Sequence, residues 1–131
     1  MYAPITTSVA IILGLWLVAL SFRVIDTRRT SGVSLGDGED KNLSRRIRAQ
    51  ANLAEYAPVS LILLFLAEAQ GASSWMLVAC SALLVIGRLA HGFALGFTEG
   101  NVPGRTGGMI MTFTAIVLLA ATNIWTLLTY S

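Results

Sequence analysis

The residues best suited to chemistry lie in the segment RAQANLAEYAP, residues 48–58. Successive residues of an α-helix turn by about 100°, so one quarter of a helix here would collect four polar side chains: Arg48, Asn52, Glu55 and Tyr56. The segment continues as VSLILLFLA, which takes the helix into hydrocarbon. Charged groups are costly at that depth unless they pair or serve a site, so this polar face is the first functional hypothesis.

The composition indicates a membrane protein that forms a single domain over residues 1–131. Hydrophobic residues make up 55% of the chain, charged residues make up only 12%, and the mean hydropathy is +0.71. Six of the nine Lys and Arg residues lie within residues 23–46. Such a cluster is typical of a loop that sets membrane topology, and we therefore expect no nucleic acid partner.

Four apolar segments supply the expected membrane spans, at about residues 3–22, 45–70, 74–93 and 107–128. Each is close to the roughly 20 residues that a helix needs to cross a bilayer. No strand-like alternation of about ten residues is visible. The sequence thus predicts an all-α integral membrane four-helix bundle, with Ser44 as the expected cap of the second helix.

The flanking charges predict the orientation. The first connection, residues 23–46, and the third, residues 94–106, hold the positive charge, whereas the second connection and the termini hold none. The positive-inside rule places these two connections in the cytoplasm and both termini outside it.

Arg48 and Glu55 lie seven residues apart, which is about 10 Å along a helix, and Asn52 lies between them as a possible bridge. Two interpretations remain open. The three side chains could form a buried network that only fixes helix register in an oligomer, or they could line a polar ligand pocket.

Arg88 and His91 lie on the third span, level with Arg48. Arg88 could instead snorkel to the interface, and His91 could be a hydrogen-bonded packing residue. A chain with one His and one Cys cannot build an ordinary zinc shell, so no metal site is expected. Five arginines gather on the predicted cytoplasmic side and predict an anionic partner: Arg28, Arg29, Arg48, Arg88 and Arg105.

Residues 48–58 resemble the second-helix signature Arg-Ala-x-x-Asn-x-x-Glu-x-x-Pro of the membrane-associated proteins in eicosanoid and glutathione metabolism. GRLAH at residues 87–91 is similar to the third helix of that family. NVPGR at residues 101–105 looks most like its small bacterial inner-membrane members. The resemblance covers nearly the whole chain.

This resemblance implies a homotrimer in the bacterial inner membrane that holds glutathione between neighbouring subunits at the cytoplasmic side. Glu55 would meet the glutathione amino group, and Arg105 or Arg29 would stabilise the thiolate by lowering the thiol pKa. Gln50, which points away from the Arg48 face, fits a site shared by two subunits. The implied glutathione-binding residues are Arg28, Arg48, Gln50, Asn52, Glu55, Tyr56, Arg88 and His91, of which Arg28, Arg48 and Arg88 would meet the carboxylates.

The implied activity is that of a glutathione transferase, with or without peroxidase activity. The thiolate would attack a lipophilic electrophile or hydroperoxide that enters from the bilayer. One position departs from the family pattern: Leu95 stands where the eicosanoid-forming members have a tyrosine. The alternative is therefore a non-catalytic lipid-binding or scaffold protein whose polar face fixes the register of the oligomer.

Overall fold

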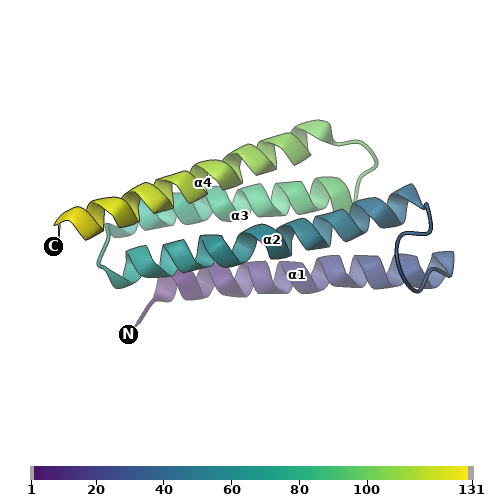
Figure 1. Ribbon diagram of the computed structural model, residues 1–131, viewed down its shortest axis with the longest axis horizontal. Coiled ribbons are helices and arrows are strands. Elements are labelled where there is room, and N and C mark those ends of the chain that lie inside the picture. Colours follow the sequence, from purple (N-terminus) through teal and green to yellow (C-terminus); the bar gives the residue numbers. More distant parts are fainter. Residues whose placement is uncertain (1, 130–131) are drawn as a thin grey trace.

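The computed structural model describes residues 2–129 and contains four antiparallel α-helices (Figure 1). They are α1 (Pro4–Ser31), α2 (Lys41–Ala69), α3 (Ser74–Gly96) and α4 (Val102–Thr129). All four are long and apolar enough to cross a membrane, and the described residues include no strand. These findings confirm an all-helical, multi-pass membrane protein.

Four helix ends differ from the prediction by three residues or more, and one of them is the end of the third helix, which lies at Gly96 rather than residue 93. The first helix continues to Ser31 rather than residue 22, the second begins at Lys41 rather than 45, and the fourth begins at Val102 rather than 107. The physical reason is that hydropathy marks only the part of a helix inside hydrocarbon, while its hydrogen bonds continue into the polar zone.

Local signals set the ends of the first connection. Gly32 adopts a left-handed φ of 69° and donates its backbone N–H to the Arg28 carbonyl, which stops α1. The Asp40 side chain accepts hydrogen bonds from the backbone N–H groups of Asn42 and Leu43 at 2.8 and 3.3 Å, and so caps α2. The predicted cap at Ser44 was wrong, because Ser44 lies within the first turns of α2.

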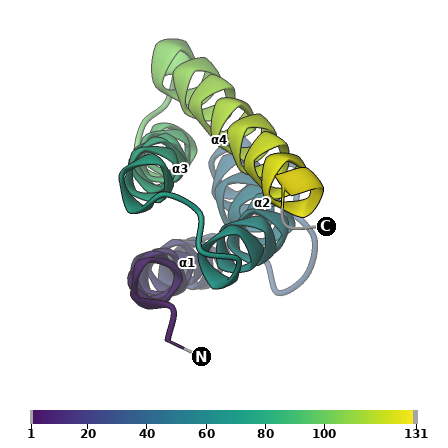
Figure 2. The ribbon, with the colours of Figure 1, turned by 90° about the vertical axis from the view of Figure 1, so that its left-hand side faces the viewer.

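The two middle helices carry the core. Figure 2 shows α2 and α3 between α1 and α4, and the outer two helices make no contact with each other along their described length. Leu13, Leu53, Leu84 and Leu119, one from each helix, are at most 2% exposed. Large apolar side chains such as Leu15 point outward, as expected of surfaces that meet lipid.

A glutamate from α2 holds the start of α1. The N-terminal amides of α1 receive no side-chain cap from Ala3. Instead, the Glu68 carboxylate accepts hydrogen bonds from the Ile5 and Thr6 backbone N–H groups at 2.9 and 2.8 Å, and from the Thr6 hydroxyl at 2.7 Å. A negative charge at a helix N-terminus is favourable, so this contact fixes α1 against α2 at the end that holds both termini.

Two glycines allow α3 and α4 to pack backbone against backbone. A methyl group added at Gly108 would lie 2.5 Å from the Gly87 carbonyl oxygen and 2.8 Å from the His91 backbone nitrogen. These atoms are too close for a side chain, and small residues are the usual means of close helix approach in membranes. The crossing places the first turns of α4 directly over the C-terminal half of α3.

We predict that Gly108→Ala destabilises the bundle by about 1 to 3 kcal/mol, because the added methyl group must push two backbones apart. Gly107→Ala is the matched control, since a methyl group there meets nothing within 4 Å and improves helix propensity. Thermal unfolding of both variants in detergent checks the prediction. An unchanged midpoint for Gly108→Ala would contradict the backbone contact.

Candidate functional site

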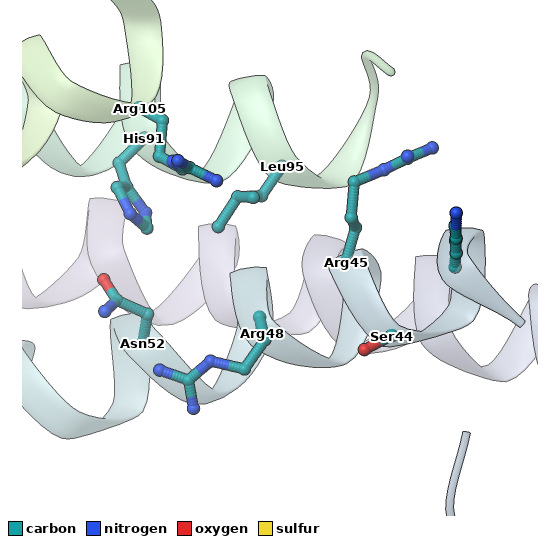
Figure 3. Close-up of a pocket in the computed structure, with 8 residues that line it drawn as sticks. Ser44, Arg45, Arg48, Asn52, His91, Leu95 and Arg105 are labelled. Carbon is teal, nitrogen blue, oxygen red and sulfur yellow. The ribbon is translucent and has the colours of Figure 1, made fainter. Parts of the chain in front are cut away.

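A cavity of about 520 Å³ opens between α2, α3 and α4, near the end of the bundle that holds the first and third connections (Figure 3). Its lining residues come from one face of α2 and from the facing parts of α3 and α4: Lys41, Ser44, Arg45, Arg48, Asn52, His91, Leu95 and Arg105. Figure 3 shows the α2 side chains opposite His91, Leu95 and Arg105. The α3–α4 glycine contact places His91 and Arg105 on the same wall.

The cavity is strongly cationic. Four of its eight lining residues carry a positive charge, and no carboxylate lines it: the cations are Lys41, Arg45, Arg48 and Arg105. Like charges gathered around one concave space produce a potential that draws in an anion. Guanidinium groups also bind carboxylates in a bidentate geometry, through two parallel hydrogen bonds. The arrangement is thus suited to a small anionic ligand.

Arg48 and Glu55 form a direct ion pair, with 3.3 Å between Nη1 and Oε1. The expected bridge through Asn52 was wrong, because the Asn52 carbonyl oxygen is occupied by another arginine. The side chains of Arg48 and Glu55 are 57% and 52% exposed. This pair therefore lies on the outside of the single subunit, beside the cavity.

Arg88 lies behind the cavity wall, and its side chain is satisfied inside the bundle. Its Nη1 donates to Asn52 Oδ1 at 2.7 Å and its Nε donates to Thr112 Oγ1 at 2.8 Å. Nη2 contacts Met109 Sδ at 3.0 Å, and the guanidinium carbon lies 5.4 Å from the centre of the Tyr56 ring. Arg88 is 1% exposed, which excludes snorkelling to the interface.

Tyr56 also lies away from the cavity, toward α4. Its ring packs against Phe113, with 5.5 Å between the ring centres. Neither Tyr56 nor Arg88 is among the residues that line the cavity. Their predicted contacts with glutathione remain predictions.

His91 is buried yet lines the cavity. It follows Arg88 by three residues on α3, and its backbone packs against Gly108. The His91 side chain makes no hydrogen bond with another described residue. Its ring nitrogens are thus available to a ligand. The hydrogen-bonded packing role considered from the sequence would have required a protein partner for them, and the structure shows none among the described residues.

Besides Glu55, Tyr56 and Arg88, three further predicted site residues do not line this cavity within one subunit. Arg28 donates from Nη1 to the Gly36 carbonyl at 2.7 Å and holds the first connection. Arg29 is exposed on α1, and Gln50 is half-buried on α2 away from the lining residues. The helix α1 contributes no lining residue at all.

The sequence prediction missed Lys41, Ser44 and Arg45 as lining residues. The signal was present in their spacing, because Lys41 and Arg45 precede Arg48 by seven and three residues and share its helical face. Starting the second helix at residue 45 left Lys41 in a loop and hid the pattern. No sequence signal identifies Thr112 and Met109 as partners of Arg88.

Comparisons with known proteins agree on one relationship. A model of the MAPEG family matches residues 6–125. Inner membrane protein YecN of Escherichia coli strain K12 is 34% identical over 116 residues, which is 88% of this chain and 87% of the relative. Inner membrane protein YecN of Escherichia coli O6:H1 strain CFT073 matches to the same extent.

We predict that Arg45→Ala weakens binding of an anionic ligand in this cavity by at least threefold, with glutathione as the first probe, because one of four cations is lost. Arg46→Ala is the matched control, since the Arg46 guanidinium donates to Thr27 Oγ1 on α1 instead. Calorimetric titration at two salt concentrations checks this. Equal losses in both variants would show that only general surface charge matters.

Proposed function

Because this chain belongs to the MAPEG family, we propose that it is a membrane-bound glutathione transferase. The family resemblance inferred from residues 48–58 is confirmed, and the family includes glutathione transferases. One observation supports the proposal most: the family-motif residues Arg48 and Asn52 line a cavity together with His91 and Arg105. That cavity is cationic, and glutathione is a small anion.

Each part of glutathione has a suitable partner at the site. Its carboxylates suit the guanidinium groups of Arg48 and Arg105, and its ammonium suits the exposed carboxylate of Glu55. A cation near the sulfur favours the thiolate over the thiol, and Arg105 is the candidate that lines the cavity. Arg29 could serve only in the site of a neighbouring copy.

The reaction would use these groups to hold and activate the thiol. After the thiol proton leaves to water, the sulfur electron pair forms a bond with an electrophilic carbon of a lipophilic substrate. The displaced group or opened oxygen takes the bonding electrons and then a proton. A hydroperoxide would instead consume two glutathione molecules, which are oxidised to the disulfide while the peroxide becomes alcohol and water.

We further propose a homotrimer with the sites between subunits. The Arg48–Glu55 pair is about half exposed on a membrane-spanning helix, where an uncovered ion pair is costly. A second copy would cover it. Because α1 contributes nothing to the cavity of its own subunit, α1 of a neighbour could supply Arg28 and Arg29 to it.

For location we propose the bacterial inner membrane, with the cavity on the cytoplasmic side and both termini outside. The YecN relatives are named as inner membrane proteins. The first and third connections, which lie at the cavity end, carry the flanking positive charges that the positive-inside rule places in the cytoplasm.

A second candidate function is a non-catalytic lipid-binding or scaffold protein. Leu95 favours it, because an apolar side chain lines the cavity where a hydroxyl could have contacted the ligand. In that case the Arg48–Glu55 pair would serve only to join subunits. Its loss would then separate the oligomer and leave glutathione without effect.

We predict that glutathione binds to the detergent-solubilised protein with the ultraviolet signal of a thiolate near neutral pH. Glu55→Gln should lower the affinity for glutathione by at least tenfold, because the neutral amide cannot form an ion pair with the glutathione ammonium group. Glu39→Gln, in the exposed first connection, should bind as the wild type does. Calorimetry and difference absorbance measure the two effects.

The oligomer mass of the same samples separates the two candidates. An intact oligomer that loses glutathione binding in Glu55→Gln supports the transferase. No binding by the wild type, with an oligomer that dissociates in the variant, would support the scaffold. Binding without a thiolate signal would refute catalysis by thiolate attack.

A further inference from the structure

The chemistry of arginine fixes the orientation of the Asn52 side chain. A guanidinium group has only donors, so the Asn52 atom that meets Arg88 Nη1 at 2.7 Å must be the carbonyl oxygen Oδ1. With Oδ1 engaged by the buried arginine, the amide cannot rotate by half a turn without placing N–H against N–H. The Nδ2 group is thus held on the opposite side of the amide.

The Nδ2 group is free to meet a ligand. Asn52 is 8% exposed and lines the cavity, and Nδ2 donates to no other described residue. Nδ2 is not one of the buried polar atoms that lack a partner, so it is accessible, and this free donor is suited to an acceptor brought by a ligand. Arg48 and Arg105, which line the same space, can also only donate.

Arg88 itself is held firmly in place. Its Nε donates to Thr112 Oγ1 at 2.8 Å and its Nη2 contacts Met109 Sδ at 3.0 Å, both on α4. Arg88 is 1% exposed and does not line the cavity of the single subunit. Its effect on a ligand must pass through Asn52.

We propose that Arg88 is a positioning residue that turns the Asn52 amide so that the inner end of the cavity selects a carboxylate over a carboxamide or ammonium group. This inference rests on the proposed glutathione function and adds the orientation in which glutathione would bind. One glutathione carboxylate lies between Asn52 and Arg105, and the ammonium lies toward Glu55 on the outer face of α2.

The test compares glutathione with two analogues in which one carboxylate, that of glycine or that of the γ-glutamyl residue, is replaced by a carboxamide. The carboxamide adds N–H donors opposite Asn52 Nδ2 and Arg105, which can only donate. The wild type should bind one analogue at least tenfold more weakly than glutathione. Equal affinity for all three ligands would overturn the proposal.

Three variants locate the cause of this preference. Arg88→Met should reduce it to below threefold, whereas Thr112→Val, which removes another Arg88 contact but keeps Asn52 in place, should retain it. In Asn52→Asp, one carboxylate oxygen can pair with Arg88 and preserve the fold, while the other oxygen offers an acceptor to the cavity. This variant should therefore bind the carboxamide analogue more tightly than glutathione. Retention of the preference in both Arg88→Met and Asn52→Asp, or its loss in Thr112→Val, would overturn the proposal.

A second measurement is independent of glutathione. In protein labelled with ¹⁵N-asparagine, the Asn52 side-chain amide resonance should move or broaden in Arg88→Met and stay unchanged in Thr112→Val. If the wild type binds no glutathione but this pattern holds, the proposed function fails and the positioning role stands. If glutathione binds but the Asn52 resonance is unchanged in Arg88→Met, the positioning role is refuted while the proposed function stands.

Discussion

The bundle depends on one buried charge. A guanidinium inside an apolar membrane domain is stable only if its donors are satisfied, and Arg88 satisfies them on two neighbouring helices. Asn52 receives it from α2, and Thr112 receives it from α4. The short reach to Thr112 is possible because Gly87 and Gly108 let α3 and α4 approach at backbone distance. Three helices are thereby fixed at the depth of the cavity.

This constraint divides the polar residues into two groups with different roles. One group, centred on Arg88, is buried and ties the helices together. The other group faces the cavity and supplies a positive potential, chiefly from one face of α2, with Arg105 opposite. Asn52 belongs to both groups, because its oxygen accepts a hydrogen bond from Arg88 and its side chain also lines the cavity. Helix packing and ligand recognition therefore meet in a single amide.

Much of the fold followed from sequence. Four apolar segments of suitable length predict four membrane spans, and the spacing of Arg48, Asn52 and Glu55 predicts a shared helical face. Helix ends were less predictable. Lys41, for example, is too polar to be counted in an apolar segment, yet it is the first residue of α2. Hydropathy reports the surrounding solvent, while backbone hydrogen bonding decides where a helix ends.

The site was predictable in kind but not in detail. Arg88 and His91 are three residues apart on α3, yet one is enclosed behind the wall and the other lines the cavity. This difference in position depends on tertiary contacts with Thr112 and Gly108 on α4. It cannot be predicted from the spacing of residues within α3. The roles proposed for Arg28 and Arg29 would require a second copy of the chain, which a single subunit does not include.

The most direct test of this account is an electron cryomicroscopy structure of the protein in lipid nanodiscs with glutathione present. The account predicts a symmetric oligomer in which the Arg48–Glu55 pair is covered by a neighbouring copy. It also predicts glutathione density in the cavity between Asn52 and Arg105. A single copy whose Arg48–Glu55 pair faces lipid, with no density in that cavity, would contradict the central claim.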